Sequence, residues 1–283
     1  MKVALIGATG QLGSDLAVAF RQEDLVLLTH ADVEVRDHVS VRAVLSEMRP
    51  DVVINTSAFH NVDLCEERID DSFAVNAFAV KNLAEVCRDL DCTLVHFSSD
   101  YVFSGDKGSP YTEDDLPRPI NVYGVSKLAG EHFIQSLWPK HMIVRTSGLF
   151  GTKGARAKGG NFVETMMRLG REREVVKVVT DQVLSPTFTP DLAAKVYELA
   201  HCGRYGLYHL TGSGYCSWYE FASRIFALAK LSARLEKTTT AQFGAKARRP
   251  AFSSLENAAI SQLGLKPLRH WEEALENYMR LRE

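Results

Sequence analysis

The sequence predicts an α/β protein built on a doubly wound parallel sheet, with a smaller mixed α/β domain attached. Short apolar runs alternate with helical patterns through the first half of the chain. These runs are continuous rather than alternating, as in strands that are buried on both faces of a sheet. Helical crossovers between such strands make them parallel.

The alternation is regular up to about residue 97. We expect strands at residues 3–6, 25–28, 33–35, 52–54 and 94–97. Apolar side chains at helical spacing mark the helices between them: Leu12, Leu16 and Phe20; Val41, Val44, Leu45 and Met48; and Phe73, Ala77, Val80, Ala84 and Cys87. Pro50 ends the second of these helices.

The pattern changes after residue 147. We therefore predict a dinucleotide-binding domain over residues 1–147 and a mainly substrate-binding domain over 148–283. The two are expected to interleave, because segments near 163–188 and 232–255 should return to the first domain. Within the first of these segments, a strand at 175–179 is expected to rejoin the main sheet.

Composition and charge narrow the class of protein. The 283 residues include 33 Lys or Arg and 35 Asp or Glu, and a net charge of -2 disfavours nucleic acid as the main partner. No apolar run approaches the ~18 residues of a membrane helix. The five cysteines form no C-x-x-C pair. This cysteine pattern favours reduced thiols, a cytoplasmic location and no metal site.

Gly7, Gly10 and Gly13 follow the first predicted strand and open the first helix. Glycines at this spacing let the backbone turn sharply and approach a pyrophosphate, which free N–H groups of the helix then bind. In a strand–helix–strand unit the pattern predicts a Rossmann-type dinucleotide site.

The end of the second predicted strand bears on the choice of cofactor. Thr29 and His30 stand there, and neither is acidic. A 2′-phosphate on the ribose is therefore not repelled, so NADPH and NADH are both acceptable. Glu34, on the short third strand, is the expected partner of the adenine amino group, with a solvated acid as the alternative.

Tyr123 and Lys127 lie four residues apart at the start of a predicted helix and share one face of it. Reduction of a ketone by hydride creates an alkoxide that needs a proton. A phenol whose pKa is lowered by a nearby cation can supply that proton. Ser98 and Ser99, at the end of the strand 94–97, offer a hydroxyl to polarise the carbonyl. Together these residues predict a nicotinamide-dependent reductase.

Several motifs carry a resemblance to a known family. They are residues 7–13, Asn55-Thr56-Ser57-Ala58, Ser98-Ser99-Asp100-Tyr101-Val102-Phe103, Tyr123-x-x-x-Lys127, Arg145-Thr146-Ser147, Asp181-Gln182-x-x-Ser185-Pro186-Thr187 and Arg249-Pro250. Over nearly its whole length the chain resembles the extended short-chain dehydrogenases/reductases, and more narrowly the dTDP-4-dehydrorhamnose reductases. The resemblance implies NAD(P)H-dependent reduction of the C4 ketone of a dTDP-6-deoxyhexulose, a step of dTDP-rhamnose biosynthesis.

The resemblance also implies a role for individual residues. Tyr123 would be the proton donor, Lys127 its activator and Ser99 the hydroxyl that orients the carbonyl. Cofactor contacts are implied for Gly7, Gly10, Gln11, Leu12, Glu34, Val35, Ala58, His60, Tyr123 and Lys127. Contacts with the dTDP-sugar are implied for Val62, Ser99, Asp100, Tyr101 and Tyr123. A homodimer is left open.

Two further expectations concern the substrate. Gly148 stands where the family usually has an aromatic residue, which predicts a hexose site of a different shape. Lys153, Arg156 and Lys158 lie in a glycine-rich loop that could clamp the diphosphate, with a solvated surface loop as the alternative.

Two other interpretations stay open. A sugar-nucleotide epimerase or 4,6-dehydratase would share the fold and the Tyr–Lys pair, although a dehydratase needs an Asp–Glu pair where this chain has Asp100 and Tyr101. The chain also resembles the non-catalytic, NADP-binding regulatory subunit of methionine adenosyltransferase. The complete set of hydroxyl, phenol and amine disfavours that interpretation, although a shared fold never guarantees activity.

Overall fold

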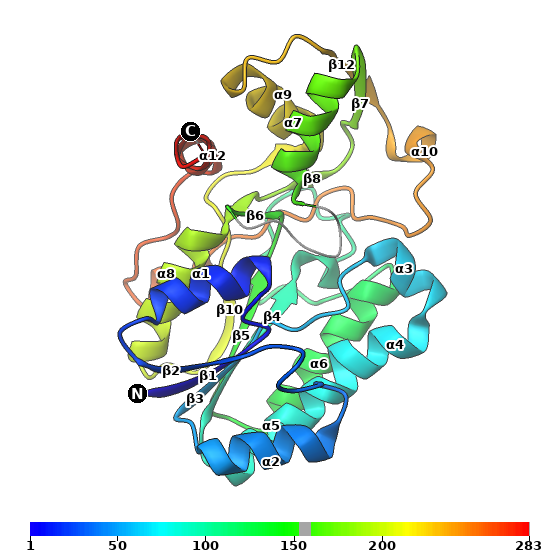
Figure 1. The fold of residues 1–283 in the computed structure, drawn as a ribbon. Helices are drawn as coiled ribbons and strands as arrows, with labels where there is room; N and C mark the ends of the chain where they lie inside the picture. Colours follow the sequence, from blue (N-terminus) through cyan, green and yellow to red (C-terminus); the bar gives the residue numbers. More distant parts are fainter. Residues whose placement is uncertain (153–159, 283) are drawn as a thin grey trace.

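A six-stranded parallel sheet forms the centre of the larger lobe, in the lower half of Figure 1. The computed structural model describes residues 1–152 and 160–282. The strands lie in the order β2-β1-β3-β4-β5-β10. Their bounds are Lys2–Ile6 for β1, Asp24–Leu28 for β2, Val52–Asn55 for β3, Thr93–Ser99 for β4, His141–Thr146 for β5 and Gly206–His209 for β10.

The strand order reverses between β1 and β3. The chain adds β2 on one side of β1 and then crosses back to place β3, β4 and β5 on the other. Ile6 pairs with Asn55 where these two strands end. In sheets of this type, ligands bind at the carboxyl ends of the strands at such a reversal. The fold therefore places the candidate site at this edge.

Helices cover both faces of the sheet (Figure 1). One face carries α1 (Gln11–Ala19), α8 (Thr189–His201) and α11 (Ala258–Gln262), and the other carries α2 (His38–Met48), α5 (Ala79–Asp89) and α6 (Val122–Leu137). Val3 and Leu5 of β1 pack in the first core, whereas Ala4 and Ile6 pack in the second. The continuous apolar run of β1 is thus buried on both sides, and the predicted doubly wound fold is confirmed.

Short elements lie along the carboxyl edge of the sheet. They are α3 (Val62–Glu67), α4 (Ile69–Phe73), a π-helix (Ala74–Phe78) that continues into α5, and a 3-10 turn (Asp100–Val102) directly after β4. Asn121 caps α6 by accepting a hydrogen bond from the N–H of Gly124 at 2.8 Å. The cap fixes the start of α6 at Val122, one residue before Tyr123.

A smaller lobe stands above this edge in Figure 1. It holds α7 (Phe162–Glu172), β7 (Val175–Val179), α9 (Trp218–Leu228), β12 (Arg234–Thr238), α10 (Thr240–Phe243) and α12 (Trp271–Arg280). Two-stranded pairs, β6 (Leu149–Phe150) with β9 (Thr187–Phe188) and β8 (Val183–Leu184) with β11 (Cys216–Ser217), connect it to the larger lobe. Its separate core includes Phe150, Phe188, Phe221 and Tyr278. A capping box of Ser217 and Glu220 begins α9.

Two predicted strands need correction. Residues 33–35 form no strand, because Asp32 accepts hydrogen bonds from the N–H and hydroxyl of Thr29 and curls the chain into turns. The predicted strand at 175–179 exists as β7, but it pairs with β12 in a separate sheet rather than rejoining the main one. The sixth strand of the main sheet is instead β10, from the second half of the chain.

Within the described ranges, none of the helices combines the length and the apolar character that crossing a bilayer requires.

Candidate active site

The glycine turn between β1 and α1 is closely packed. Gly7 has φ +80°, in the left-handed region, and a Cβ there would lie 2.5 Å from the hydroxyl oxygen of Thr56. A Cβ on Gly13 would lie 2.2 Å from the carbonyl oxygen of Gly7. Both positions therefore require glycine, so that α1 can start directly over the end of β1.

The N-terminus of α1 faces the carboxyl edge with free hydrogen-bonding capacity. Gly10 is the N-cap and supplies no side chain to the first-turn N–H groups. The Oε1 atom of Gln11 is buried without a hydrogen-bond partner among the described residues. A helix start of this kind binds a pyrophosphate, so the turn fits a dinucleotide. Leu12 is buried and packs in the sheet core.

Glu34 lies in the loop between β2 and α2, half-exposed. Its carboxylate accepts hydrogen bonds from Nε and Nη2 of Arg36 at 3.1 and 3.2 Å, which lower the pKa of Glu34. His30 Nε2 lies 3.5 Å away. Val35 is 8% exposed and packs in the second sheet core. Both residues follow β2, at the same edge of the sheet as the glycine turn.

The segment after β3 is held against α6 by Asn76. The side chain of Asn76 accepts a hydrogen bond from the N–H of Phe59 at 2.9 Å and donates to the Phe59 carbonyl and to Ser126 Oγ, both at 3.0 Å. This clamp fixes Ala58 and His60, which lie on either side of Phe59. It was not foreseen from the sequence, although the π-helix that carries Asn76 is a feature often found at functional sites.

The turn after β4 carries a buried carboxylate that binds three hydroxyl groups. Asp100 accepts hydrogen bonds from Ser99 at 2.9 Å, from Ser147 at 2.9 Å and from Ser253 at 2.6 Å. Burial raises the pKa of Asp100 to about 6, against the lowering effect of these three hydrogen bonds. The sequence did not predict the contacts of Ser147 and Ser253.

Two tyrosine rings close the site. Tyr101 and Tyr123 meet edge to face, with ring centroids 5.9 Å apart. Burial raises the pKa of Tyr123 above its ordinary value, and a hydrogen bond with Ser99 opposes this effect. We expected Lys127 to lower the pKa of Tyr123; burial of the phenol raises this pKa, and the effect of Lys127 stays a prediction. The residues that the structure brings together around the phenol are Ser99, Asp100 and Tyr101.

Lys127 is 1% exposed, which is rare for an ammonium group. Burial lowers its pKa to about 8, while the charge of Glu131, one helical turn further along α6, raises it. Glu131 itself forms a buried ion pair with Arg145 at 2.6 Å and accepts a hydrogen bond from Ser98. A carboxylate four residues after Lys127 could have been noticed in the sequence as a group on the same helix face.

Val62 begins α3, which packs against α6. The next residue, Asp63, binds Arg249 at 2.8 Å, and a hydrogen bond between Arg249 and Tyr101 joins this pair to the site. The Arg249-Pro250 motif is thereby connected to the turn after β4, across a large separation in sequence.

Gly148 has φ +54°, in the region that favours glycine. A Cβ there would lie 2.6 Å from Leu184 Cδ1 and 3.2 Å from Pro186 Cα. Leu184 thus fills the space that a side chain at position 148 would enter. The cationic clamp predicted for Lys153, Arg156 and Lys158 lies outside the described residues.

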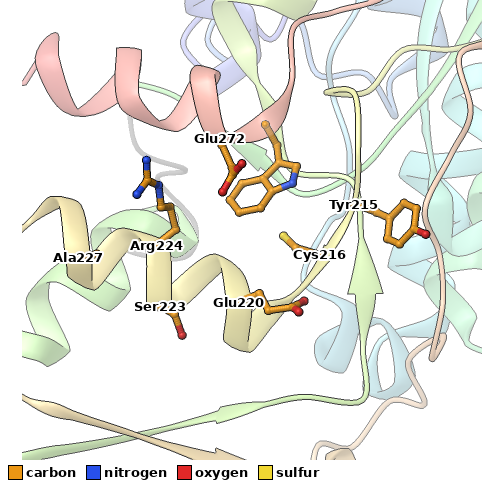
Figure 2. Close-up of a pocket in the computed structure, with 8 residues that line it drawn as sticks. Tyr215, Cys216, Glu220, Ser223, Arg224, Ala227 and Glu272 are labelled. Carbon is orange, nitrogen blue, oxygen red and sulfur yellow. The ribbon is translucent and has the colours of Figure 1, made fainter.

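A cavity of about 460 Å³ opens on the smaller lobe between α9 and α12 (Figure 2). Its lining includes Tyr215, Cys216, Glu220, Arg224 and Glu272. Glu220 caps α9, and Arg224 pairs with Glu276 of α12, so these charges serve the packing of the lobe. None of the predicted site residues lines this cavity.

Comparison with known proteins agrees with this geometry. A family model described as the RmlD substrate binding domain matches residues 1–282. The spore coat polysaccharide biosynthesis protein SpsK of Bacillus subtilis is 39% identical over 99% of this chain and 98% of its own length.

Two solved structures are also similar. The dTDP-4-dehydrorhamnose reductase of Clostridium acetobutylicum has a TM-score of 0.96 and 37% identity, over 100% of this chain and 99% of that one. The dTDP-4-dehydrorhamnose reductase of Bacillus anthracis, solved in complex with NADP, has a TM-score of 0.93 and 38% identity, over 99% of this chain and 100% of that one. The match over nearly the whole chain shows that this protein belongs to the dTDP-4-dehydrorhamnose reductase (RmlD) family of extended short-chain dehydrogenases/reductases.

Proposed function

We propose that the protein is an NADPH-dependent reductase of the C4 ketone of dTDP-4-dehydrorhamnose, with dTDP-rhamnose as the product. One observation carries the proposal: Ser99, Tyr123 and Lys127 are all buried or half-buried at the edge of the sheet where the glycine turn opens. Family membership and the NADP in a similar structure support it. NADH is the alternative cofactor.

The cofactor residues follow from the fit of the glycine turn. Gly7, Gly10, Gln11 and Leu12 would hold the pyrophosphate at the start of α1, where first-turn N–H groups lack a side-chain cap. Other parts of the same edge would complete the site: Glu34 and Val35 beside the adenosine, Ala58 and His60 along the channel, and Tyr123 and Lys127 at the nicotinamide ribose. When bound, the cofactor supplies the hydride.

The residues of this chain supply the proton. Tyr123 donates from its hydroxyl to the carbonyl oxygen as negative charge develops there. Ser99 orients the same oxygen and is itself held by Asp100 at 2.9 Å. In its charged form, Lys127 stabilises the phenolate that remains on Tyr123. The burial that raises the pKa of Tyr123 keeps the phenol protonated until a substrate oxygen arrives.

The substrate would lie between the two lobes. We assign Val62, Asp100 and Tyr101 to its sugar nucleotide, together with Ser99 and Tyr123. The division into a cofactor domain at 1–147 and a mainly substrate-binding domain at 148–283 is part of this proposal, and so are a cytoplasmic location and a homodimer. A hexose site altered at Gly148 also stays a prediction.

The test is a direct assay. Purified protein is mixed with NADPH or NADH and with dTDP-4-keto-6-deoxyhexoses of both C5 configurations, and absorbance at the reduced nicotinamide band is followed. The proposal predicts cofactor oxidation with the substrate of the rhamnose series, and NMR of the product gives its C4 configuration. The sugars are compared directly on the unmodified protein, because the positive φ of Gly148 and the contact with Leu184 would strain a larger residue at that position.

The alternative interpretations give different results. An epimerase or dehydratase would retain oxidised cofactor through purification and convert the sugar nucleotide without net oxidation of NADPH. A regulatory subunit would bind the cofactor, turn over none of the sugars and associate stably with another enzyme.

A further inference from the structure

His96 connects the end of β3 to the amine of Lys127. The ring lies in β4, three residues before Ser99, and is fully buried. Its Nδ1 atom is 3.2 Å from Asn55 Nδ2, and its Nε2 atom is 3.3 Å from Lys127 Nζ. No motif in the sequence singled out His96, and its two contacts assign it a role that depends on which nitrogen carries the proton.

The orientation of Asn55 decides that question. Its Oδ1 atom accepts hydrogen bonds from the backbone N–H of Ser57 at 3.0 Å and from the Ser57 hydroxyl at 2.6 Å. A backbone N–H can only donate, so the atom beside Ser57 is the oxygen and the amide nitrogen faces His96. The Nδ1 atom of His96 must therefore accept, and a neutral ring then carries its proton on Nε2.

The Nε2–H of His96 points at Lys127. An ammonium has three donors and no acceptor, so it cannot accept this hydrogen bond, whereas a neutral amine has a lone pair that can. We propose that His96, held in one tautomer by Asn55, is a positioning residue that favours the neutral form of Lys127 before the cofactor binds.

Burial and the charge of Glu131 act on the protonation of Lys127 in opposite directions. Tyr123 and Glu131 face it from its own helix, Asp100 lies on the turn after β4, and Arg145 lies on β5. Glu131 favours the ammonium, but its charge is shared with Arg145 through their buried ion pair. Burial lowers the pKa of Lys127 to about 8, so a contact with one N–H can decide its protonation near neutral pH.

A consequence for cofactor binding follows, and it rests on the proposed function. A ribose hydroxyl beside Lys127 would accept a hydrogen bond from the ammonium and favour the charged form. Binding of the dinucleotide is then coupled to the uptake of a proton from solvent by the Lys127 amine. This proton later balances the phenolate charge on Tyr123.

The tautomer can be tested without any cofactor. Long-range ¹H–¹⁵N correlation spectra of the full-length protein distinguish the ring nitrogen that carries the proton from the one that accepts. The proposal predicts that His96 stays neutral with its proton on Nε2 from pH 6 to pH 9. A doubly protonated ring, or a proton on Nδ1, would overturn it.

Coupling to Lys127 is tested with the Asn55→Asp variant. A carboxylate at position 55 can still accept the hydrogen bonds of Ser57, and it can also accept one from His96. The ring then carries its proton on Nδ1, and the lone pair of Nε2 faces Lys127. Calorimetry of NADPH binding in buffers of different ionisation enthalpy measures the protons taken up. Because the pKa of Lys127 in the free protein is then higher, proton uptake begins at a higher pH. In Asn55→Asp, the pH of half-maximal uptake on this rising limb should increase by about one unit.

A control in a second background separates the effect of the His96 tautomer on Lys127 from the direct effect of a carboxylate charge at position 55 on it. The same Asn55→Asp change in a His96→Phe protein should give a clearly smaller shift, because the ring that relays it is gone. Equal shifts in both backgrounds would mean that the carboxylate acts on Lys127 directly, and the proposal would be wrong. If NADPH does not bind at all, the proposed function fails, while the tautomer measurement still decides the role of His96.

Discussion

The backbone of Gly124 lies against the carbonyl of Tyr101, so closely that a Cβ at position 124 would stand 2.1 Å from that oxygen. Gly124 follows Tyr123 on α6, and Tyr101 follows Asp100 on the turn after β4. The missing side chain therefore sets how close the phenol of Tyr123 lies to the strand end that carries Ser99.

A Gly124→Ala substitution should separate these two elements. We expect kcat for ketone reduction to fall about 100-fold, because misplacing a reacting group by ~1 Å costs on this order. Steady-state assays measure the effect, and thermal unfolding checks that the variant folds. Val125→Ala, at an exposed position of the same helix, is the control. Unchanged kcat in a folded Gly124→Ala protein would show that the contact does not position Tyr123.

The two neighbouring serines of β4 should behave differently. Ser99 donates to Asp100 and interacts with Tyr123, whereas Ser98 donates to Glu131. Ser99→Ala should lower kcat by about 10²-fold, and the loss of its hydrogen bond to Asp100 should also lower the unfolding free energy. Ser98→Ala should keep its kcat but lose about 1.5–3 kcal/mol of unfolding free energy, as expected for a hydrogen bond to a charged group. The same loss of kcat in both variants would contradict the assignment.

Asp100 should make the protein less stable as pH rises. Its pKa is about 6 in the folded protein, against an ordinary value of 3.8 for an aspartate side chain. Between these values the native state binds more protons than the unfolded state. The contribution of Asp100 to stability is therefore complete below pH 3.8 and is lost as pH rises through 6, for a total of about 3 kcal/mol.

Denaturant unfolding at pH 4 to 7 measures this contribution. Asp100→Asn does not titrate, so the difference in unfolding free energy between wild type and variant should change with pH across this window. A constant difference would show that Asp100 titrates at its ordinary pKa.

The buried ion pair of Glu131 with Arg145 should matter strongly for the free energy of unfolding. Glu131→Gln leaves the buried Arg145 cation without its partner, which typically costs about 3–5 kcal/mol of unfolding free energy. Glu172→Gln breaks the exposed pair with Arg168 and should cost less than about 1 kcal/mol. Chemical denaturation of both variants tests the contrast, and similar losses would show that burial does not matter here.

The parts of the fold that could be predicted depend on local chemistry. Strands β1 to β4 follow from buried apolar runs, and the glycine turn follows from backbone geometry at Gly7 and Gly13. Residues 33–35 also look like a strand, but the side chain of Asp32 turns the backbone instead. The pairing of β7 with β12 could not be predicted, because an apolar run does not specify its partner strand.

Some residues of the candidate site could likewise be recognised from the sequence, and others could not. Tyr123 and Lys127 are recognisable because their spacing places them on one helix face. The contact of Asp100 with Ser253 joins residues far apart in the chain, and only the fold brings them together. His96 carried a usable signal, since a histidine inside a buried strand needs polar partners. Asn55 and Lys127 are those partners.

Single-turnover reduction by the Tyr123→Phe variant tests the central claim most directly. With NADPH and dTDP-4-dehydrorhamnose, the rate of nicotinamide oxidation should fall by about 10²–10⁴-fold, because the proton donor is missing. Fluorescence titration measures NADPH binding separately, so that the loss of the Tyr123 hydroxyl at the nicotinamide ribose is not mistaken for a loss of proton transfer. A variant that binds NADPH and oxidises it at the wild-type rate would show that another group protonates the product, and would contradict the account.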